Sequence, residues 1–170
     1  PRLKAATIGW QHNCYDGYLH VKPVVFWQQE NLLQQYLPNL DRYIVLSDYD
    51  KRDYMEKLGI DCEVKINPRS FVSEKKCDVK SKRFLMATRF VYAKGLDLMM
   101  ESFEEFCKED SEWELDIIGD GDLFDQIRAD AKKRHLEKRV HFVGYTNEPE
   151  KYYLNSSVFL LPSRWEGWPM

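Results

Sequence analysis

Short apolar runs and longer amphipathic segments alternate along the second half of the chain. The apolar runs have the composition of strands buried on both faces, and the amphipathic segments carry apolar residues at the helix period. Strands are predicted over residues 84–88, 113–118, 140–143 and 158–161, and helices over 96–109, from the turn after 118 to about 134, and over 148–154. The clearest helical stripe consists of Met99, Met100, Phe103, Phe106 and Cys107. Four strands that alternate with helices predict right-handed crossovers and a doubly wound, parallel α/β sheet.

The first half of the chain has the same kind of pattern in a less regular form. Strands are predicted over residues 5–10, 42–46 and 62–66, and helices over 27–37 and 48–58, with a loop around Gly17. Asp48 is the predicted N-cap of the second helix, and Gly59 is its predicted C-cap. A polar tract follows and indicates a linker. The domains expected are a remnant over 1–66, a linker region over 67–83 and an incomplete second domain over 84–170.

Composition narrows the class of protein. Of the 170 residues, 44% are hydrophobic and 31% are charged, which is typical of a globular chain. The formal net charge of -3 argues against a general nucleic-acid-binding protein, and no apolar run is long enough for a membrane span. The four cysteines are scattered, without a C-x-x-C pair, and indicate reduced thiols rather than a metal site.

An anion site is predicted where the strand over 84–88 ends. Arg89 and Lys94 lie in the loop that follows this strand, and Gly95 permits a tight turn before the next helix. Unpaired N–H groups at a helix N-terminus attract negative charge, which the two cations would neutralise. The other strands are followed by further candidates, namely Gly119-Asp120-Gly121-Asp122, Tyr145 and Glu166. Because ligands of doubly wound sheets bind at the carboxyl ends of the strands, these residues are predicted to share one edge.

Four segments together resemble a known family. They are ATRFVYAKGLDLMMESF, WELDIIGDGDLFDQI, RVHFVGY and VFLLPSRWEGWPM, in this order from about Arg83 to Met170. In order and spacing they resemble the donor-binding domain of the GT-B glycosyltransferases of family GT4, also called glycosyl transferases group 1. The earlier segments GWQHN and DRYIVLSDYDKRDYMEKLGI resemble the end of that family's N-terminal domain. The resemblance implies a Rossmann-like GT-B fold, truncated here at both ends.

The resemblance implies an enzyme of polysaccharide biosynthesis. Such an enzyme transfers a sugar from a nucleotide-diphosphate sugar donor to a glycan or lipid-linked acceptor, with retention of anomeric configuration. It requires no metal, because fixed cations and helix N–H groups can stabilise the leaving diphosphate, and no cofactor besides the donor substrate. A cytoplasmic location is implied, with the inner face of the membrane and peripheral membrane association of the full-length protein as further options. No nucleic-acid partner is implied.

The family motifs imply a role for individual residues. Arg89 and Lys94 match the cations that hold the donor diphosphate. Glu166 and His12 are the candidate catalytic residues: Glu166 matches a glutamate that contacts hydroxyls of the transferred sugar, and His12 matches a histidine of the N-terminal domain that faces this sugar. The nucleotide and its base would be lined by Gly119, Gly121, Tyr145 and Gly167. The second glutamate of the family's E-x7-E motif would fall beyond Met170. A continuation at Pro169 is expected to be helical.

Two alternatives remain open. YIVLSDYDKRD resembles the D-x-D segment of haloacid-dehalogenase-type magnesium-dependent phosphatases, with Asp48 as nucleophile and Asp50 as acid/base. IGDGDLFD resembles the later metal-binding segment of that family, but Lys51 and Arg52 stand where it has Gly-Thr. The second alternative is a non-catalytic nucleotide-binding module, because a donor cleft needs two walls and the chain supplies little of one.

Overall fold

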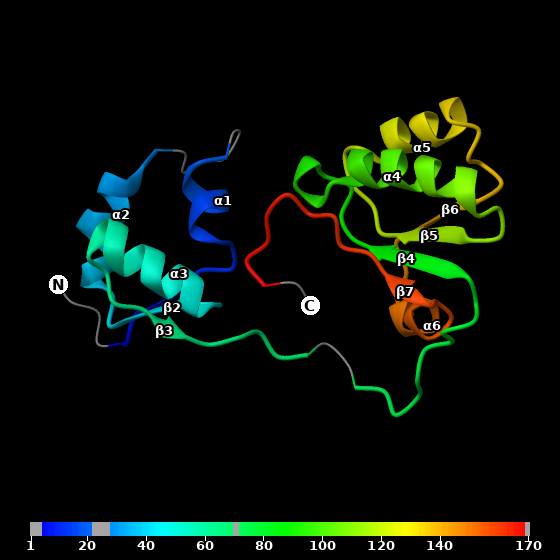
Figure 1. The fold of residues 1–170 in the computed structure, drawn as a ribbon. Coiled ribbons are helices and arrows are strands. Elements are labelled where there is room, and N and C mark those ends of the chain that lie inside the picture. The colour runs from blue at the N-terminus through cyan, green and yellow to red at the C-terminus, as the bar shows by residue number, and fades with distance from the viewer. Residues whose placement is uncertain (1–4, 22–27, 70–71, 169–170) are drawn as a thin grey trace. The chain divides into compact units, whose positions relative to one another are not determined.

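A computed structural model describes residues 5–21, 28–69 and 72–168. The chain folds into two compact units (Figure 1). The first comprises Pro1–Val72 together with Trp165–Met170, and the second comprises Ser73–Arg164. The chain therefore passes from the first unit to the second within the predicted linker region. The helix expected to start at Pro169 lies outside the described residues.

The second unit contains a four-stranded parallel sheet. Its strands stand in the order β6-β5-β4-β7, with the bounds Arg83–Ala87 for β4, Glu114–Ile118 for β5, Val140–Gly144 for β6 and Val158–Phe159 for β7. The helical segments are η3 (Tyr92–Lys94), α4 (Leu96–Glu109), α5 (Phe124–Lys133) and α6 (Pro149–Leu154). In Figure 1, α4 and α5 lie together on one face of this sheet, and α6 lies on the other face beside β7. The predicted parallel, doubly wound arrangement is confirmed.

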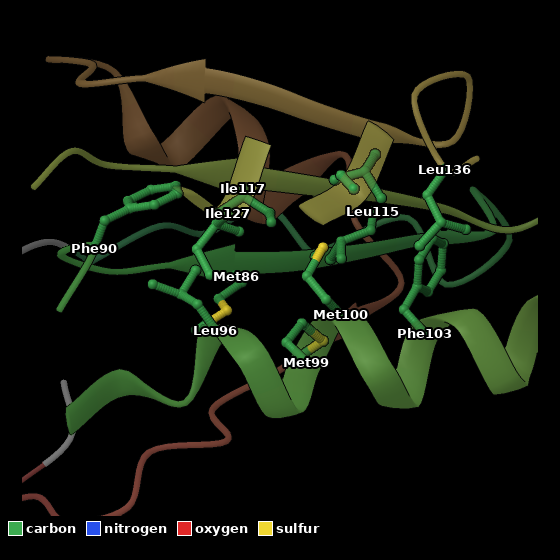
Figure 2. Packing of buried hydrophobic residues seen from close by; sticks show 12 residues of the cluster. Met86, Phe90, Leu96, Met99, Met100, Phe103, Leu115, Ile117, Ile127 and Leu136 are labelled. Atoms are coloured by element: carbon green, nitrogen blue, oxygen red, sulfur yellow. The ribbon is translucent and has the colours of Figure 1, made fainter. Parts of the chain in front are cut away.

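The core of the second unit lies between the sheet and α4 (Figure 2). Met86 of β4 and Leu115 and Ile117 of β5 are fully buried, and they pack in one cluster with Met100 and Phe103 of α4. Full burial of one such side chain stabilises the fold by about 1.5–3 kcal/mol. The predicted stripe of α4 is confirmed, since Met99, Met100 and Phe103 are buried and Phe106 and Cys107 are partly buried against the same cluster.

The first unit contains a smaller parallel sheet. Its strands stand in the order β1-β2-β3, with the bounds Ile8–Trp10, Arg42–Val45 and Glu63–Val64. Its helical segments are α1 (Tyr15–Leu19), α2 (Glu30–Tyr36), η1 (Leu37–Asn39), α3 (Asp48–Asp53) and η2 (Tyr54–Leu58). A buried cluster joins these elements and consists of Tyr15, Leu19, Val45, Tyr54, Ile60 and Cys62. Three of its members are aromatic or branched side chains from helices, so the helices supply much of the core.

Several boundaries in the first unit differ from the prediction. The region around Gly17 is the helix α1 rather than a loop, and the Cys14 sulfur caps it by accepting from the Gly17 N–H. The helix predicted over 27–37 is described from Glu30, whereas Trp27 lies outside the described residues. The predicted N-cap Asp48 is wrong, because the Ser47 hydroxyl accepts from the Asp50 N–H and Asp48 is the first residue of α3.

Several strands are shorter than predicted, and two cases have a visible cause. The N–H of Thr7, inside the strand predicted over 5–10, donates to the Asp41 carboxylate at 2.7 Å, so a side chain replaces a strand partner there. The strand predicted over 158–161 is described only over Val158–Phe159. Pro162 follows closely and has no N–H with which to extend the ladder. Gly59 is the C-cap of the helical segment before it, as predicted, with φ 70°.

Candidate functional site

Backbone hydrogen bonds join three loops at the carboxyl edge of the second unit's sheet. The Thr88 N–H after β4 donates to the Ile118 carbonyl of β5 at 2.9 Å. The Gly119 N–H after β5 donates to the Gly144 carbonyl of β6 at 2.8 Å. The Phe90 N–H donates to the Asp120 carbonyl at 2.9 Å. The loops after β4, β5 and β6 thus meet at this edge, whereas Glu166, predicted to share it, belongs to the first unit.

Gly119 and Gly121 are required by this close approach of two backbones. A Cβ on Gly119 would lie 1.8 Å from the Thr88 carbonyl oxygen, and a Cβ on Gly121 would lie 2.8 Å from the Phe90 carbonyl oxygen. Both residues also have positive φ, 125° and 150°. A side chain at either position would push the two loops apart. The two glycines thus build the edge, and contact of either with a nucleotide base stays a prediction.

The two predicted cations lie in the loop between β4 and α4. Arg89 is exposed, and within the described part of the chain its guanidinium has no hydrogen-bond or ion-pair partner. Lys94 is half-buried and is the last residue of η3. Gly95 then has φ 67°, a left-handed conformation that ends η3 and begins α4. The structure brings the two cations to the predicted loop, and their binding of one anion stays a prediction.

The loop after β7 packs against the turn between β4 and α4. A Cβ on Gly95 would lie 2.1 Å from the Pro162 carbonyl oxygen, so the two backbones touch. The Arg164 N–H donates to the Ala93 carbonyl at 2.8 Å. The Arg164 guanidinium donates to both carboxylate oxygens of Asp97, at 2.8 and 2.6 Å. Because β4 and β7 are neighbours at the point where the strand order reverses, this turn stands at the topological switch point of the sheet.

Arg164 also contacts Tyr92. Its guanidinium donates to the Tyr92 carbonyl at 3.0 Å and stacks 4.0 Å from the centre of the Tyr92 ring. Its hydrogen bonds lower the pKa of the Asp97 carboxyl below the usual value. Arg164 is not among the residues singled out from the sequence. The available signal is that it stands inside the segment PSRWEG, beside the candidate Glu166.

Tyr145 follows β6 directly and is 79% exposed. Its position after the strand agrees with the prediction, and no described contact assigns its ring to a base. A separate hollow of about 420 Å³ lies between α4 and the end of β7. Its lining is almost entirely apolar, with Phe84, Phe103 and Leu160 among its residues. A diphosphate needs charged or N–H partners, so this hollow is unsuited to it.

The remaining candidates belong to the first unit. A Cβ on Gly167 would lie 2.3 Å from the His12 carbonyl oxygen, so the backbone at Gly167 rests on the loop after β1. Next to it, the Trp165 ring reaches within 2.5 Å of where a Gly17 Cβ would stand. The exposed His12 ring stacks on Trp10 at 5.2 Å between ring centroids. Glu166 is half-buried between its two anchored neighbours.

Asp48 and Asp50 do not fit the phosphatase alternative. Asp50 is 2% exposed, and its carboxylate accepts from the Tyr15 N–H at 2.9 Å and the Ser47 hydroxyl at 2.6 Å. It thus serves to join α1 to α3. Asp48 is exposed at the start of α3. In the described ranges no three His, Cys, Asp or Glu side chains form a group that could hold a metal ion, and no helix is both long and apolar enough to cross a membrane.

The parallel sheet with a tightly closed carboxyl edge places the second unit among the Rossmann-like α/β proteins. The model of one such family, described as "Glycosyl transferases group 1", matches residues 70–170. The chain belongs to this family. The match includes every candidate of the carboxyl edge and Glu166, whereas His12 lies before it.

Individual relatives agree with this assignment. An uncharacterized glycosyltransferase of Haemophilus influenzae is 28% identical over 132 residues, covering 76% of this chain and 37% of the relative. The poly(ribitol-phosphate) alpha-N-acetylglucosaminyltransferase of Staphylococcus aureus is 26% identical over 150 residues, covering 84% and 29%. A crystal structure of a mutant of S. aureus TarM in complex with Fondaparinux, alpha-GlcNAc-glycerol and UDP has a TM-score of 0.84 at 22% identity, covering 97% of this chain and 34% of that chain. The chain spans about a third of the length of these proteins.

Proposed function

We propose that the chain supplies donor-binding residues of a glycosyltransferase that transfers a sugar from a nucleotide-diphosphate sugar to a glycan or lipid-linked acceptor. The observation that carries the proposal is the turn after β4, which offers Arg89 and Lys94 at the switch point of the sheet, inside the region matched by the family. The TarM complex contains UDP, which supports a nucleotide-linked donor. Cytoplasmic location and peripheral membrane association of the full-length protein are part of the proposal.

The proposed chemistry follows from the residue types. Departure of the diphosphate builds negative charge, which the guanidinium of Arg89 and the ammonium of Lys94 stabilise without a metal. The carboxylate of Glu166 orients hydroxyls of the sugar, and His12 contacts the sugar as it becomes cationic. The base is lined by the remaining candidates, Gly119, Gly121, Tyr145 and Gly167. Retention of anomeric configuration belongs to the proposal on the resemblance alone.

The test is nucleotide binding by the chain and its charge variants. Arg89→Ala and Lys94→Ala should each weaken binding of UDP, GDP or ADP, whichever binds best, by about 2–3 kcal/mol. Lys133→Ala is the matched control. It also removes one positive charge, but Lys133 is the last residue of α5, and this helix begins at the carboxyl edge and runs away from it. Equal affinity of the Arg89 and Lys94 variants and the parent chain would refute the proposed diphosphate site.

A second function to weigh is nucleotide binding without transfer. It is favoured by one observation, namely that the chain spans about a third of its relatives' length. We expect the 170-residue chain to bind nucleotide weakly and to transfer no detectable sugar. Sugar transfer by this chain at an ordinary enzymatic rate would show that the site is complete without further segments.

A further inference from the structure

Arg164 makes an unusual number of contacts for a residue of a short loop. It joins four groups, which are the two oxygens of the Asp97 carboxylate, the Tyr92 carbonyl and the face of the Tyr92 ring. Its own backbone N–H holds the Ala93 carbonyl. Its side chain is only 20% exposed, whereas that of Asp97 is 54% exposed. The planar guanidinium suits this set of partners, because it offers donors in a fixed fork that an ammonium does not.

All of these contacts fall on two residues of η3 and on the first turn of α4. Tyr92 and Ala93 are the two residues of η3 that precede Lys94. Asp97 lies in the first turn of the helix that follows. The close approach of Gly95 to the Pro162 carbonyl adds a backbone contact between the same two loops. Arg164 therefore holds both ends of the short segment on which Lys94 stands.

We propose that Arg164 is a positioning residue of the donor site, which fixes the η3 turn and thereby the Lys94 ammonium at the place where the diphosphate binds. This inference rests on the proposed function. Its physical basis is that a charge stabilises a bound anion only at the right distance, since the interaction energy falls as the ammonium moves away. Without the contacts of Arg164, the η3 turn would also have to lose conformational freedom when the ligand binds. This entropic cost would weaken binding.

Asp97 allows the positioning role to be separated from a simple charge effect. Asp97→Ala removes a negative charge near the proposed diphosphate, which by electrostatics alone would strengthen the binding of an anion. The same change deletes the main partner of Arg164, which by our proposal loosens the turn and weakens binding. The two accounts predict opposite signs for one variant.

The experiment is a titration of the isotope-labelled 170-residue chain with UDP, followed through the backbone amide signals of Lys94 and Gly95. Arg164→Ala should weaken UDP binding about tenfold, and Arg164→Lys should recover only part of this loss, because it restores the charge but not the fork. Asp97→Ala should also weaken binding. Arg134→Ala is the matched control, because Arg134 likewise bridges two carboxylates, those of Asp130 and Glu104, at the far end of α5.

The outcomes separate this inference from the proposed function. If Lys94→Ala weakens UDP binding while Arg164→Ala and Asp97→Ala do not, the positioning role of Arg164 is refuted and the donor site stands. If UDP leaves the Lys94 and Gly95 signals of the parent chain unchanged, the proposed donor site itself fails and the inference with it. If Arg164→Ala does not fold, Arg164→Lys and Asp97→Ala decide, and unchanged or tighter UDP binding by both overturns the inference.

Discussion

The backbone of Gly167 rests directly on the carbonyl of His12. A Cβ built on Gly167 would lie 2.3 Å from the His12 oxygen and 2.9 Å from the Asn13 Cα. Two segments from opposite ends of the sequence are thus in van der Waals contact inside the first unit. The contact fixes the backbone next to Glu166. The two candidate catalytic residues, His12 and Glu166, therefore belong to the same local structure.

We expect Gly167→Ala to loosen this contact. Its methyl group would meet backbone atoms, which cannot rotate away as a side chain can, so the cost should be about 1–3 kcal/mol. Thermal unfolding and protease cleavage near Trp165 would measure it. Gly59→Ala is the control, because nothing lies within 4 Å of its Cβ position and only the backbone conformation is strained. Equal protection of the Trp165 segment in the Gly167 variant and the parent chain would contradict the described contact.

Gly95→Ala should damage the second unit more than an ordinary surface substitution. The residue has φ 67°, and its Cβ would lie 2.1 Å from the Pro162 carbonyl oxygen. Strain and overlap act together, so we expect a loss of about 2–3 kcal/mol in the free energy of unfolding. Urea unfolding followed by tryptophan fluorescence would measure this loss. A loss below that of Gly144→Ala, where φ is also positive but no atom is near, would show that the Pro162 contact is absent.

Asp50→Ala should destabilise the first unit, because Asp50 has a structural role and not a catalytic one. The change leaves the buried N–H of Tyr15 without its carboxylate partner, which costs about 1–3 kcal/mol. Asp48→Ala is the matched control, because Asp48 is exposed and stands two residues earlier on α3. Chemical denaturation of both variants decides. A phosphomonoester assay with magnesium adds a second check, since hydrolysis that depends on Asp48 would revive the phosphatase alternative.

The pair of carboxylates at His20 predicts a pH dependence of stability. The hydrogen bond to Asp16, followed by the one to Glu30, raises the pKa of His20 above its usual value of about 6.5 despite some burial. The folded protein then binds this proton more tightly than the unfolded chain. The resulting stabilisation is complete below about pH 6.5 and is lost as the pH rises through the raised pKa of His20.

The measurement for His20 is a comparison of the parent chain with His20→Gln. The difference between their melting temperatures should be larger at pH 5.5 than at pH 8.5, and it should be small, because the His20 side chain is 42% exposed and solvent screens the pairs. A difference that does not change with pH would show that His20 is not held by the two carboxylates in solution.

The strands of the second unit are predictable because each is a compact apolar run, and the central strands β4 and β5 carry the buried residues of the sheet. The edge that carries Arg89 and the glycine turn is predictable for a related reason, since parallel strands all end at one edge. The helix α1 is not predictable in this way. It has five residues, one of which is Gly17, and it depends on the Cys14 cap and on the carboxylate of Asp50, which lies 35 positions away.

The role of Arg164 also cannot be predicted from the residues next to it in the sequence. Its partners Asp97 and Tyr92 lie 67 and 72 positions earlier, and only the placement of β7 beside β4 brings them together. In the segment PSRWEG the glutamate attracts attention because of its chemistry, whereas the arginine before it resembles any surface cation. Long-range pairing, rather than local pattern, gives this arginine its structural function.

The docking of Trp165 over Gly17 has a consequence for how the protein is made. During synthesis, residues up to Val72 leave the ribosome well before Trp165 exists, so the first unit must wait, incomplete, while the second unit is translated. Folding of the second unit shortens the span that the chain must close, because a compact body replaces a long flexible loop. Within residues 1–170, the first unit is thus begun before the second unit and receives Trp165 only after it.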